Sequence, residues 1–401
     1  MRPISPLLVG SLGVLALLGC SSSYDNQGPS SSYLVNAIAV ADLDGNGQPD
    51  ILGVVSRDVD GQSAQGYVST RLQNTDGSFV LPTRFGLGRA PANLAIADVN
   101  GDGRPDLVAA NADDQTVTVR LADPARPGFF FPAILLSTPG RTPLDVAVGD
   151  LNGDGNPDIL VAASGANNVM IFLQGATTGT FLAPVLLPVG GDPQAVTVAD
   201  LDGDGQPDIA AATTANTVSV LRQIQFSPTL VAQSAVDFPT GVQPVAIKAA
   251  DLNGDGKLDL VTANFGAALS PNNQGLSLLL QTTPGSFAAP VSYATGYRAS
   301  GLAVGDLNGD GQPDIAVACA GLPGDPGAVS VILHSAPAAA TPGVFLGAVN
   351  YTGAWGPMGV AIADMDGDGL PDLVVADGDI TVRYNRTATP GTFDPPLFFY
   401  N

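Results

Sequence analysis

Seven near-copies of one nine-residue stretch constrain this chain more than any other feature. The stretch reads DLNGDGNPD at residues 150–158, and its copies begin at Asp42, Asp98, Asp150, Asp200, Asp251, Asp306 and Asp364. Successive copies begin 50 to 58 residues apart. A repeat of this length means that one supersecondary unit recurs, as it does in solenoids, propellers and arrays of small sheets.

Each copy lies between two short apolar segments. Segments such as AIAVAD and AVTVAD precede the copies, and segments such as DILGVV and DIAAAT follow them. Their Val, Ile, Leu and Ala content and their Gly and Pro boundaries predict two strands joined by the nine-residue loop. A third strand, such as QTVTVRL, comes next. The fourth repeat has SPTLVAQ in its last part, but in the other six we expect a fourth strand to begin at a Gly-x-Phe-like turn, at Phe79, Phe129, Phe181, Phe287, Phe345 and Phe393.

Four antiparallel strands per repeat predict an all-β fold, a seven-bladed β-propeller over residues 33–401. A closed ring stacks each sheet against its neighbours and protects the sheet edges. Ala and Gly in the first strands suit the crowded centre of such a ring. We expect each blade to be one contiguous repeat, so that the first and last blades meet without an exchanged strand. The alternative is that residues 33–35 reach a neighbouring blade.

The acidity of the chain is concentrated in the repeated loops. All 37 acidic residues are Asp, against 15 basic residues, and 23 of these Asp lie in the seven loops. No basic stripe is present, which argues against a nucleic-acid partner. Oxygen-bearing side chains recur at the first, third, fifth and ninth loop positions, and glycine at the sixth permits a positive φ. This oxygen-rich pattern favours calcium over magnesium, which demands a stricter octahedron. It therefore predicts up to seven Ca²⁺ sites.

The loop differs from an EF-hand, because strands flank it and no acid stands at the twelfth position. The repeat instead resembles the FG-GAP, or VCBS, family, the unit that builds the head of integrin α-chains. This resemblance covers residues 33–401 and implies structural calcium sites in hairpins on one face of the propeller. The side chains that it implies as ligands are Asp42, Asp44, Asn46, Asp50, Asp98, Asn100, Asp102, Asp106, Asp150, Asn152, Asp154, Asp158, Asp200, Asp202, Asp204, Asp208, Asp251, Asn253, Asp255, Asp259, Asp306, Asn308, Asp310, Asp314, Asp364, Asp366, Asp368 and Asp372.

The seventh residue of each loop is expected to add a backbone carbonyl oxygen. These residues are Gln48, Arg104, Asn156, Gln206, Lys257, Gln312 and Leu370. One loop departs from the family pattern at its fifth position, where Asn46 replaces the commoner Asp.

The first 32 residues are expected to lie outside the fold. Arg2 and the apolar run 7–18 predict a signal peptide over residues 1–19, because the run is too short to span a bilayer. The run ends in LLGC, which resembles the lipobox of bacterial lipoproteins and implies lipidation of Cys20. A polar tether completes residues 20–32. Ser21 follows Cys20, so we expect a lipid anchor on the outer membrane or cell surface rather than on the inner membrane.

The chain is poor in catalytic groups. It has one histidine, His334, which we expect at the surface or a strand end, and one cysteine within the expected fold, Cys319, which we expect to be buried. We therefore predict a monomeric, non-enzymatic, calcium-binding module for adhesion or for binding a protein or glycan. The alternatives are a lectin-like carbohydrate binder and a calcium-dependent glycan lyase or hydrolase.

The predicted topology also places a candidate ligand face. If the calcium loops join first strands to second strands, the connections between blades and from second to third strands lie on the opposite face. Loops on a rigid scaffold commonly carry function. The candidate residues on that face are Trp355, Tyr297, Arg298, Arg89, Arg141 and Phe265.

Overall fold

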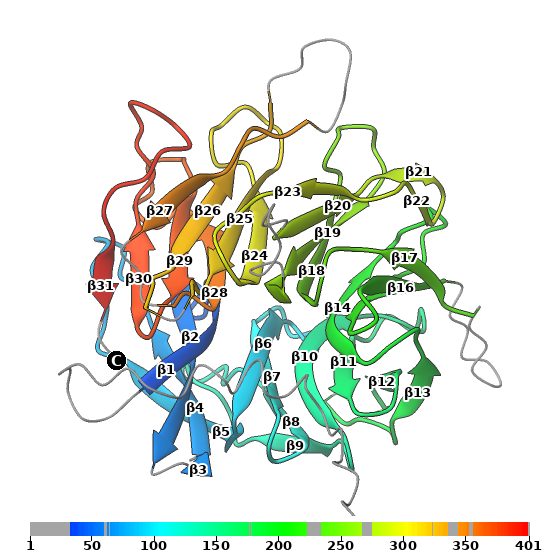
Figure 1. The fold of residues 1–401 in the computed structure, drawn as a ribbon. Coiled ribbons are helices and arrows are strands. Elements are labelled where there is room, and N and C mark those ends of the chain that lie inside the picture. The colour runs from blue at the N-terminus through cyan, green and yellow to red at the C-terminus, as the bar shows by residue number, and fades with distance from the viewer. Residues whose placement is uncertain are drawn as a thin grey trace, which may run out of the picture.

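The computed structural model is a closed ring of seven four-stranded blades, which Figure 1 shows along the ring axis. The structure describes residues 33–59, 62–63, 65–175, 177, 179–222, 234–266, 275–322, 324–335, 344–352 and 356–399. The signal peptide, Cys20 and tether that the sequence predicts lie outside the described residues. The predicted all-β, seven-bladed architecture is confirmed.

The first three blades are built from consecutive antiparallel strands. Blade one contains β1 (Tyr33–Ala41), β2 (Asp50–Val59), β4 (Gln65–Arg71) and β5 (Thr83–Arg89), and the short β3 (Gln62–Ser63) pairs with β2. Blade two contains β6 (Pro91–Ala97), β7 (Asp106–Asn111), β8 (Thr116–Arg120) and β9 (Ile134–Ser137). Blade three contains β10 (Thr142–Gly149), β11 (Asp158–Ser164), β12 (Asn168–Phe172) and β13 (Val185–Pro188).

The remaining blades repeat this order. Blade four contains β14 (Pro193–Ala199), β15 (Asp208–Thr213), β16 (Thr217–Leu221) and β17 (Val236–Pro239). Blade five contains β18 (Pro244–Ala250), β19 (Asp259–Asn264), β20 (Leu276–Leu279) and β23 (Val291–Tyr293), with a small hairpin of β21 (Gln281–Thr283) and β22 (Ser286–Phe287). Blade six contains β24 (Ala299–Gly305), β25 (Asp314–Cys319), β26 (Ala328–Ile332) and β27 (Val349–Thr352). Blade seven contains β28 (Gly359–Ala363), β29 (Asp372–Ala376), β30 (Ile380–Arg383) and β31 (Leu397–Phe399).

The ring closes without an exchanged strand, as the sequence predicts. The backbone of Tyr33 to Val35 pairs with Arg57 to Val55 of β2, so these residues belong to blade one and not to a neighbour. Blade one meets blade seven through a shared apolar cluster that includes Val35, Ile51 and Val374. Hydrophobic burial therefore continues across the closure of the ring.

The cores of this protein lie between blades. Seven apolar clusters are present among the described residues, and each is formed by two adjacent blades. The second strands are buried along their whole length in most blades, as in β11 and β19, because both of their faces contact neighbouring sheets. The ring is thus stabilised by stacking of sheets, as expected for a propeller.

Small residues allow the first strands to approach one another at the centre. A Cβ added to Gly301 would lie 2.8 Å from the carbonyl oxygen of Met358 in the next blade. A Cβ added to Gly149 would lie 2.9 Å from Val198 Cγ1. Glycine is therefore required at these positions because of close approach, as the Ala and Gly content of the segments predicts.

One prediction about the fourth strands is wrong. The phenylalanines of the Gly-x-Phe-like turns precede the fourth strands and pair with a residue just after the third strand, as Phe79 does with Gln73. In blade two Phe130, not Phe129, holds this place. Phe130 packs in the cluster shared by blades one and two. The aromatic residue packs in the core between blades. Its hydrophobicity therefore reflects core packing and not the start of a strand.

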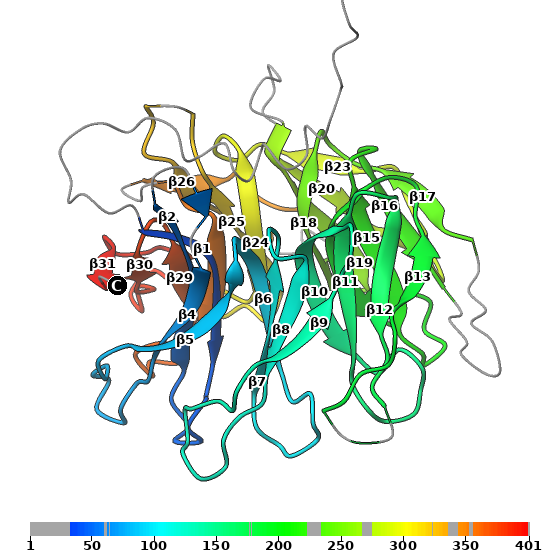
Figure 2. The ribbon, with the colours of Figure 1, turned by 90° about the horizontal axis from the view of Figure 1, so that it is seen from below.

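The two faces of the ring differ in their connections. The hairpins from first to second strands carry the nine-residue loops on one face, at the lower edge of the view in Figure 2. The second-to-third connections and the links between blades lie on the opposite face, which we call the connection face. This arrangement follows from the antiparallel order within each blade.

Candidate metal centres

Each nine-residue loop is folded around its first Asp. In all seven loops the backbone N–H groups of the fifth and sixth residues donate to this carboxylate, as Asp204 and Gly205 donate to Asp200 at 3.2 and 2.9 Å. The sixth-position glycines have φ between 81° and 90°, and a Cβ added there would meet no atom within 4 Å. The predicted need for glycine is therefore conformational, not steric.

The third and fifth side chains also accept hydrogen bonds from the loop backbone. The third residue accepts the N–H of the fifth in every loop, at 2.9 Å where Asn253 accepts from Asp255. The fifth residue accepts the N–H of the seventh, at 2.8 Å where Asp204 accepts from Gln206. Backbone donors thus fix the direction of three acidic or amide side chains in each loop.

The ninth Asp has a different environment. It is at most 1% exposed in every blade, and its Oδ2 accepts the N–H of the second loop residue. In six blades its Oδ1 accepts the N–H of a residue just after the third strand, as Asp158 accepts from Gln174 at 2.8 Å. The corresponding segment of blade four lies outside the described residues. This carboxylate therefore ties the loop to the third strand of its own blade.

Burial raises the pKa of these ninth carboxyls. Desolvation is the largest cause, and it raises the pKa of Asp50, Asp106, Asp158, Asp259 and Asp314 from 3.8 to about 6 and that of Asp372 to about 7. The neighbouring loop carboxylates add to this rise, whereas the two backbone donors oppose it. A nearby cation would favour the ionised form.

Three loops bring three carboxylates together. In the loops of blades one, four and seven, one oxygen from each of the first, third and ninth Asp lies within 4.8 Å of the other two. The third-position side chain is an Asn in the other four loops. The fifth residue of these loops, Asn46, Asp204 or Asp368, is outside the triplets and accepts the N–H of the seventh residue. Carboxylate and amide oxygens are the ligands that calcium prefers, so the residues present fit this ion.

The second loop residue anchors each loop in the core between two blades. This residue is Leu43, Val99, Leu151, Leu201, Leu252, Leu307 or Met365, and it is at most 5% exposed in every blade. Each packs in the cluster that its blade shares with the next. The geometry of the loop is therefore coupled to the contact between neighbouring blades.

A second coupling comes from amide side chains that our sequence reasoning missed. Gln174 Nε2 donates to the carbonyl of Val99 in the preceding blade at 2.9 Å and to that of Pro157 in its own loop at 2.8 Å. Gln281 and Asn385 make the same pair of bonds in blades five and seven. The sequence contains a pattern that indicates these residues, because an amide side chain follows the third strand in the segments FLQ, LLQ and RYN.

The same bond closes the ring. Gln73 Nε2 in blade one donates to the carbonyl of Met365 in the blade-seven loop at 2.7 Å. Blade six has His334 at the equivalent position. Its ring is buried edge-on against Phe345, so the prediction of a surface histidine is wrong and that of a strand-end position is right. Cys319 is buried, as predicted, and burial raises the pKa of its thiol.

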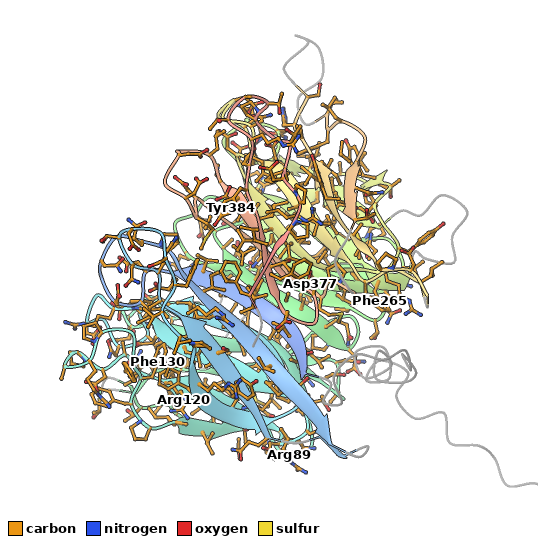
Figure 3. All side chains as sticks on the ribbon, turned by 90° about the vertical axis from the view of Figure 1, so that its left-hand side faces the viewer. Arg89, Arg120, Phe130, Phe265, Asp377 and Tyr384 are labelled. Atoms are coloured by element: carbon orange, nitrogen blue, oxygen red, sulfur yellow. The ribbon has the colours of Figure 1, made fainter. Side chains whose placement is uncertain are left out.

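The candidate ligand-face residues that the structure describes lie on the connection face without forming one cluster. Arg298 lies over the ring of Phe265, with its Cζ 5.6 Å from the ring centroid. Tyr297 is 41% exposed. Arg89 forms an ion pair with Asp114 at 2.6 Å, and Figure 3 shows Arg89 at the lower edge of the molecule, well away from Phe265. Arg141 is half-buried, and Trp355 lies outside the described residues.

The described part of the chain contains no helix with the length and hydropathy that a bilayer span requires.

Comparison with known proteins places this geometry in a family. No curated protein matches the chain. Among solved structures, BBS1N, crystallised in complex with ARL6DN, aligns with a TM-score of 0.53 and 13% identity over 89% of this chain and 94% of that chain. A protein from Lactobacillus plantarum aligns with a TM-score of 0.53 and 13% identity over 80% of this chain and 86% of that chain. These likenesses concern the fold.

The family model described as an FG-GAP-like repeat matches residues 54–109, 98–161, 150–211, 200–262 and 265–317. Each of the five matches begins in one blade and extends through the nine-residue loop of the next blade into its second strand. Together the five matches cover more than half of the chain, and the chain belongs to the family of proteins built from FG-GAP-like repeats.

Proposed function

We propose that this protein is a calcium-binding propeller that acts as a non-enzymatic binding module outside the cytoplasm. The observation that supports calcium binding most strongly is the convergence of three carboxylates in the loops of blades one, four and seven. Three carboxylates so close repel one another, and a divalent cation removes that repulsion. The same register of side chains recurs in the other four loops, with Asn at the third position.

The first, third, fifth and ninth side chains and the seventh carbonyl of each loop would hold the ion. Calcium would supply charge neutralisation and would fix the loop whose second residue packs between blades. The ion would therefore stabilise each contact between neighbouring blades. Calcium concentrations outside cells suit sites of modest affinity.

The binding role rests on the contrast between the two faces. The loop face repeats one chemistry seven times, whereas the connection face carries different residues in each blade, including Arg89, Tyr297 and Phe265. Such variation on a rigid scaffold supports recognition of a specific partner. Lipidation at Cys20 would tether the propeller to the outer membrane or cell surface through residues 20–32.

The test is a screen of the calcium-loaded protein on glycan and peptide arrays, with a parallel assay of polysaccharide cleavage. We expect saturable binding to at least one array class in 1 mM calcium, its loss in chelator, and no cleavage. Turnover of a polysaccharide would show that the protein is an enzyme and not only a binding module. Failure to bind either array would contradict the recognition role.

A further inference from the structure

The first strands enclose a cavity at the centre of the ring. Its volume is about 650 Å³, and residues of β1, β6, β10, β14, β18, β24 and β28 line it. Most of these residues are Ala, Val, Ile or Leu. Phe265, from the connection between β19 and β20, also lines it, so the cavity extends toward the connection face. A cavity of this size accommodates a small organic molecule.

Two charged residues break the repetition of the cavity wall. The residue of each first strand that pairs with the third residue of the second strand is Ala39, Ala95, Ala147, Thr197, Lys248, Ala303 or Ala361. Blade five thus places a lysine where five blades have alanine. A second position lies two residues before this one in each first strand, nearer the connection face. Blade three has Asp145 there, whereas the other blades have Ala, Asn or Gly.

The Asp145 carboxylate is held in a fixed position by three blades. Its Oδ1 accepts the Asn93 amide at 2.7 Å from blade two and the Val146 N–H at 2.9 Å from its own strand. Its Oδ2 accepts the Val196 N–H at 3.0 Å from blade four. Carboxylate oxygens can accept about four hydrogen bonds in all, so Oδ2 keeps capacity for one further donor.

Lys248 has no such partners. Its side chain is exposed, and within the described residues its ammonium forms no hydrogen bond and no ion pair within 4.0 Å. Asp145 is near enough to feel its charge without contacting it. Among the residues that the structure describes, Lys248 and Asp145 are the only charged ones that line the cavity. The cavity therefore contains one fixed acceptor and one cation with its donors free.

We propose that this central cavity binds a small hydroxylated carboxylate, such as a sugar acid, with its carboxylate on Lys248 and a hydroxyl donating to Asp145 Oδ2. Alanine and valine side chains of the wall would contact the carbon skeleton. Phe265 would contact the ligand from the connection-face side. This inference names a ligand class for the binding module proposed above and rests on that proposal.

The cation makes an acid preferable to a neutral sugar. A carboxylate accepts a charge-assisted hydrogen bond from the Lys248 ammonium, whereas a neutral sugar offers it only uncharged acceptors. Hydrogen bonds to charged groups contribute about 1.5–3 kcal/mol, so loss of the lysine should weaken binding by about ten-fold or more.

The test is calorimetric titration of the calcium-loaded protein with D-glucuronate, D-gluconate and glycolate, and with D-glucose as the neutral control. Lys248→Met removes the cavity cation, and Arg386→Met removes the same charge from an exposed ion pair in the connection between β30 and β31. We expect at least one carboxylate to bind the wild type and Arg386→Met equally, to bind Lys248→Met at least about ten-fold more weakly, and to bind more tightly than glucose.

Asp145→Asn separates the hydroxyl contact from the charge. If the sugar hydroxyls reach the Asp145 carboxylate, this substitution should weaken the binding of glucuronate or gluconate more than the binding of glycolate. Absence of binding by all three carboxylates, or equal binding by Lys248→Met, would overturn the inference. An array hit in the preceding screen that Lys248→Met leaves unchanged would keep the binding module and place its ligand elsewhere.

Discussion

The loops and the central cavity use repetition in opposite ways. The seven loops carry Asp or Asn acceptors at the same positions, and all of them are tied to the cores between blades by a buried second residue. The cavity wall consists mostly of small apolar residues and carries charges at Asp145 and Lys248. Chemistry that recurs in every blade stabilises the ring, whereas a charge that occurs once can recognise a ligand.

Removing calcium should produce the largest effect, because it acts on every loop at once. If each site has a Kd of about 0.1 mM, then about 1 mM calcium adds roughly 1.4 kcal/mol per site. Seven independent sites would add about 10 kcal/mol to the free energy of unfolding, comparable to the net stability of a whole domain. Denaturant titrations in 1 mM calcium and in chelator measure this difference. Equal unfolding midpoints in calcium and in chelator would show that calcium in the loops does not stabilise the fold.

The pH dependence in chelator should be the next largest effect, because six loops contribute to it. A carboxyl whose folded pKa is about 6, raised from 3.8, stabilises the fold fully below about pH 4 and loses that contribution as the pH rises through about 6. We expect the metal-free protein to lose stability between pH 4 and pH 7. In saturating calcium the loss should disappear, because the ion favours ionised carboxyls. A metal-free melting temperature that rises over this range would contradict the pKa assignment.

Single substitutions should distinguish two kinds of acid within one loop. Asp158→Ala removes a buried carboxylate that accepts two backbone N–H groups, so it should cost about 3 kcal/mol even in chelator. Asp154→Ala changes an exposed side chain and should weaken calcium binding with little effect on the metal-free protein. Denaturation of both variants in chelator checks this. Equal losses would mean that the ninth position has no separate structural role.

The amide bridges between blades should give the smallest effect. Gln281→Leu leaves the carbonyls of Leu201 and Leu258 without the amide donor and should cost about 1–2 kcal/mol. Thr282→Val, at the exposed neighbouring position, is the matched control and should change stability by less than about 0.5 kcal/mol. If both variants unfold at the same denaturant concentration, the bridge contributes nothing measurable.

The sequence predicted the repeated features better than the single ones. Strand periodicity and the loop register, seen seven times, predicted the blade order and the face that carries the loops. The fourth strands were misplaced because Phe130 and its equivalents are apolar for a reason other than strand pairing: they fill the core between blades. Asp145 and Lys248 were not singled out, since only closure of the ring brings strands of blades three and five to one cavity. Nothing local in the segments LDVAVGD and AIKAAD indicates this neighbourhood.

The number of calcium ions bound per chain tests the central claim most directly. Protein stripped with chelator and dialysed into 1 mM calcium can be assayed for bound metal by atomic emission, with parallel dialysis in magnesium. We predict close to seven calcium ions per chain and few magnesium ions, because every loop presents Asp or Asn acceptors in the same register. A value of zero or one calcium ion would show that the loops are hydrogen-bonded turns that need no metal.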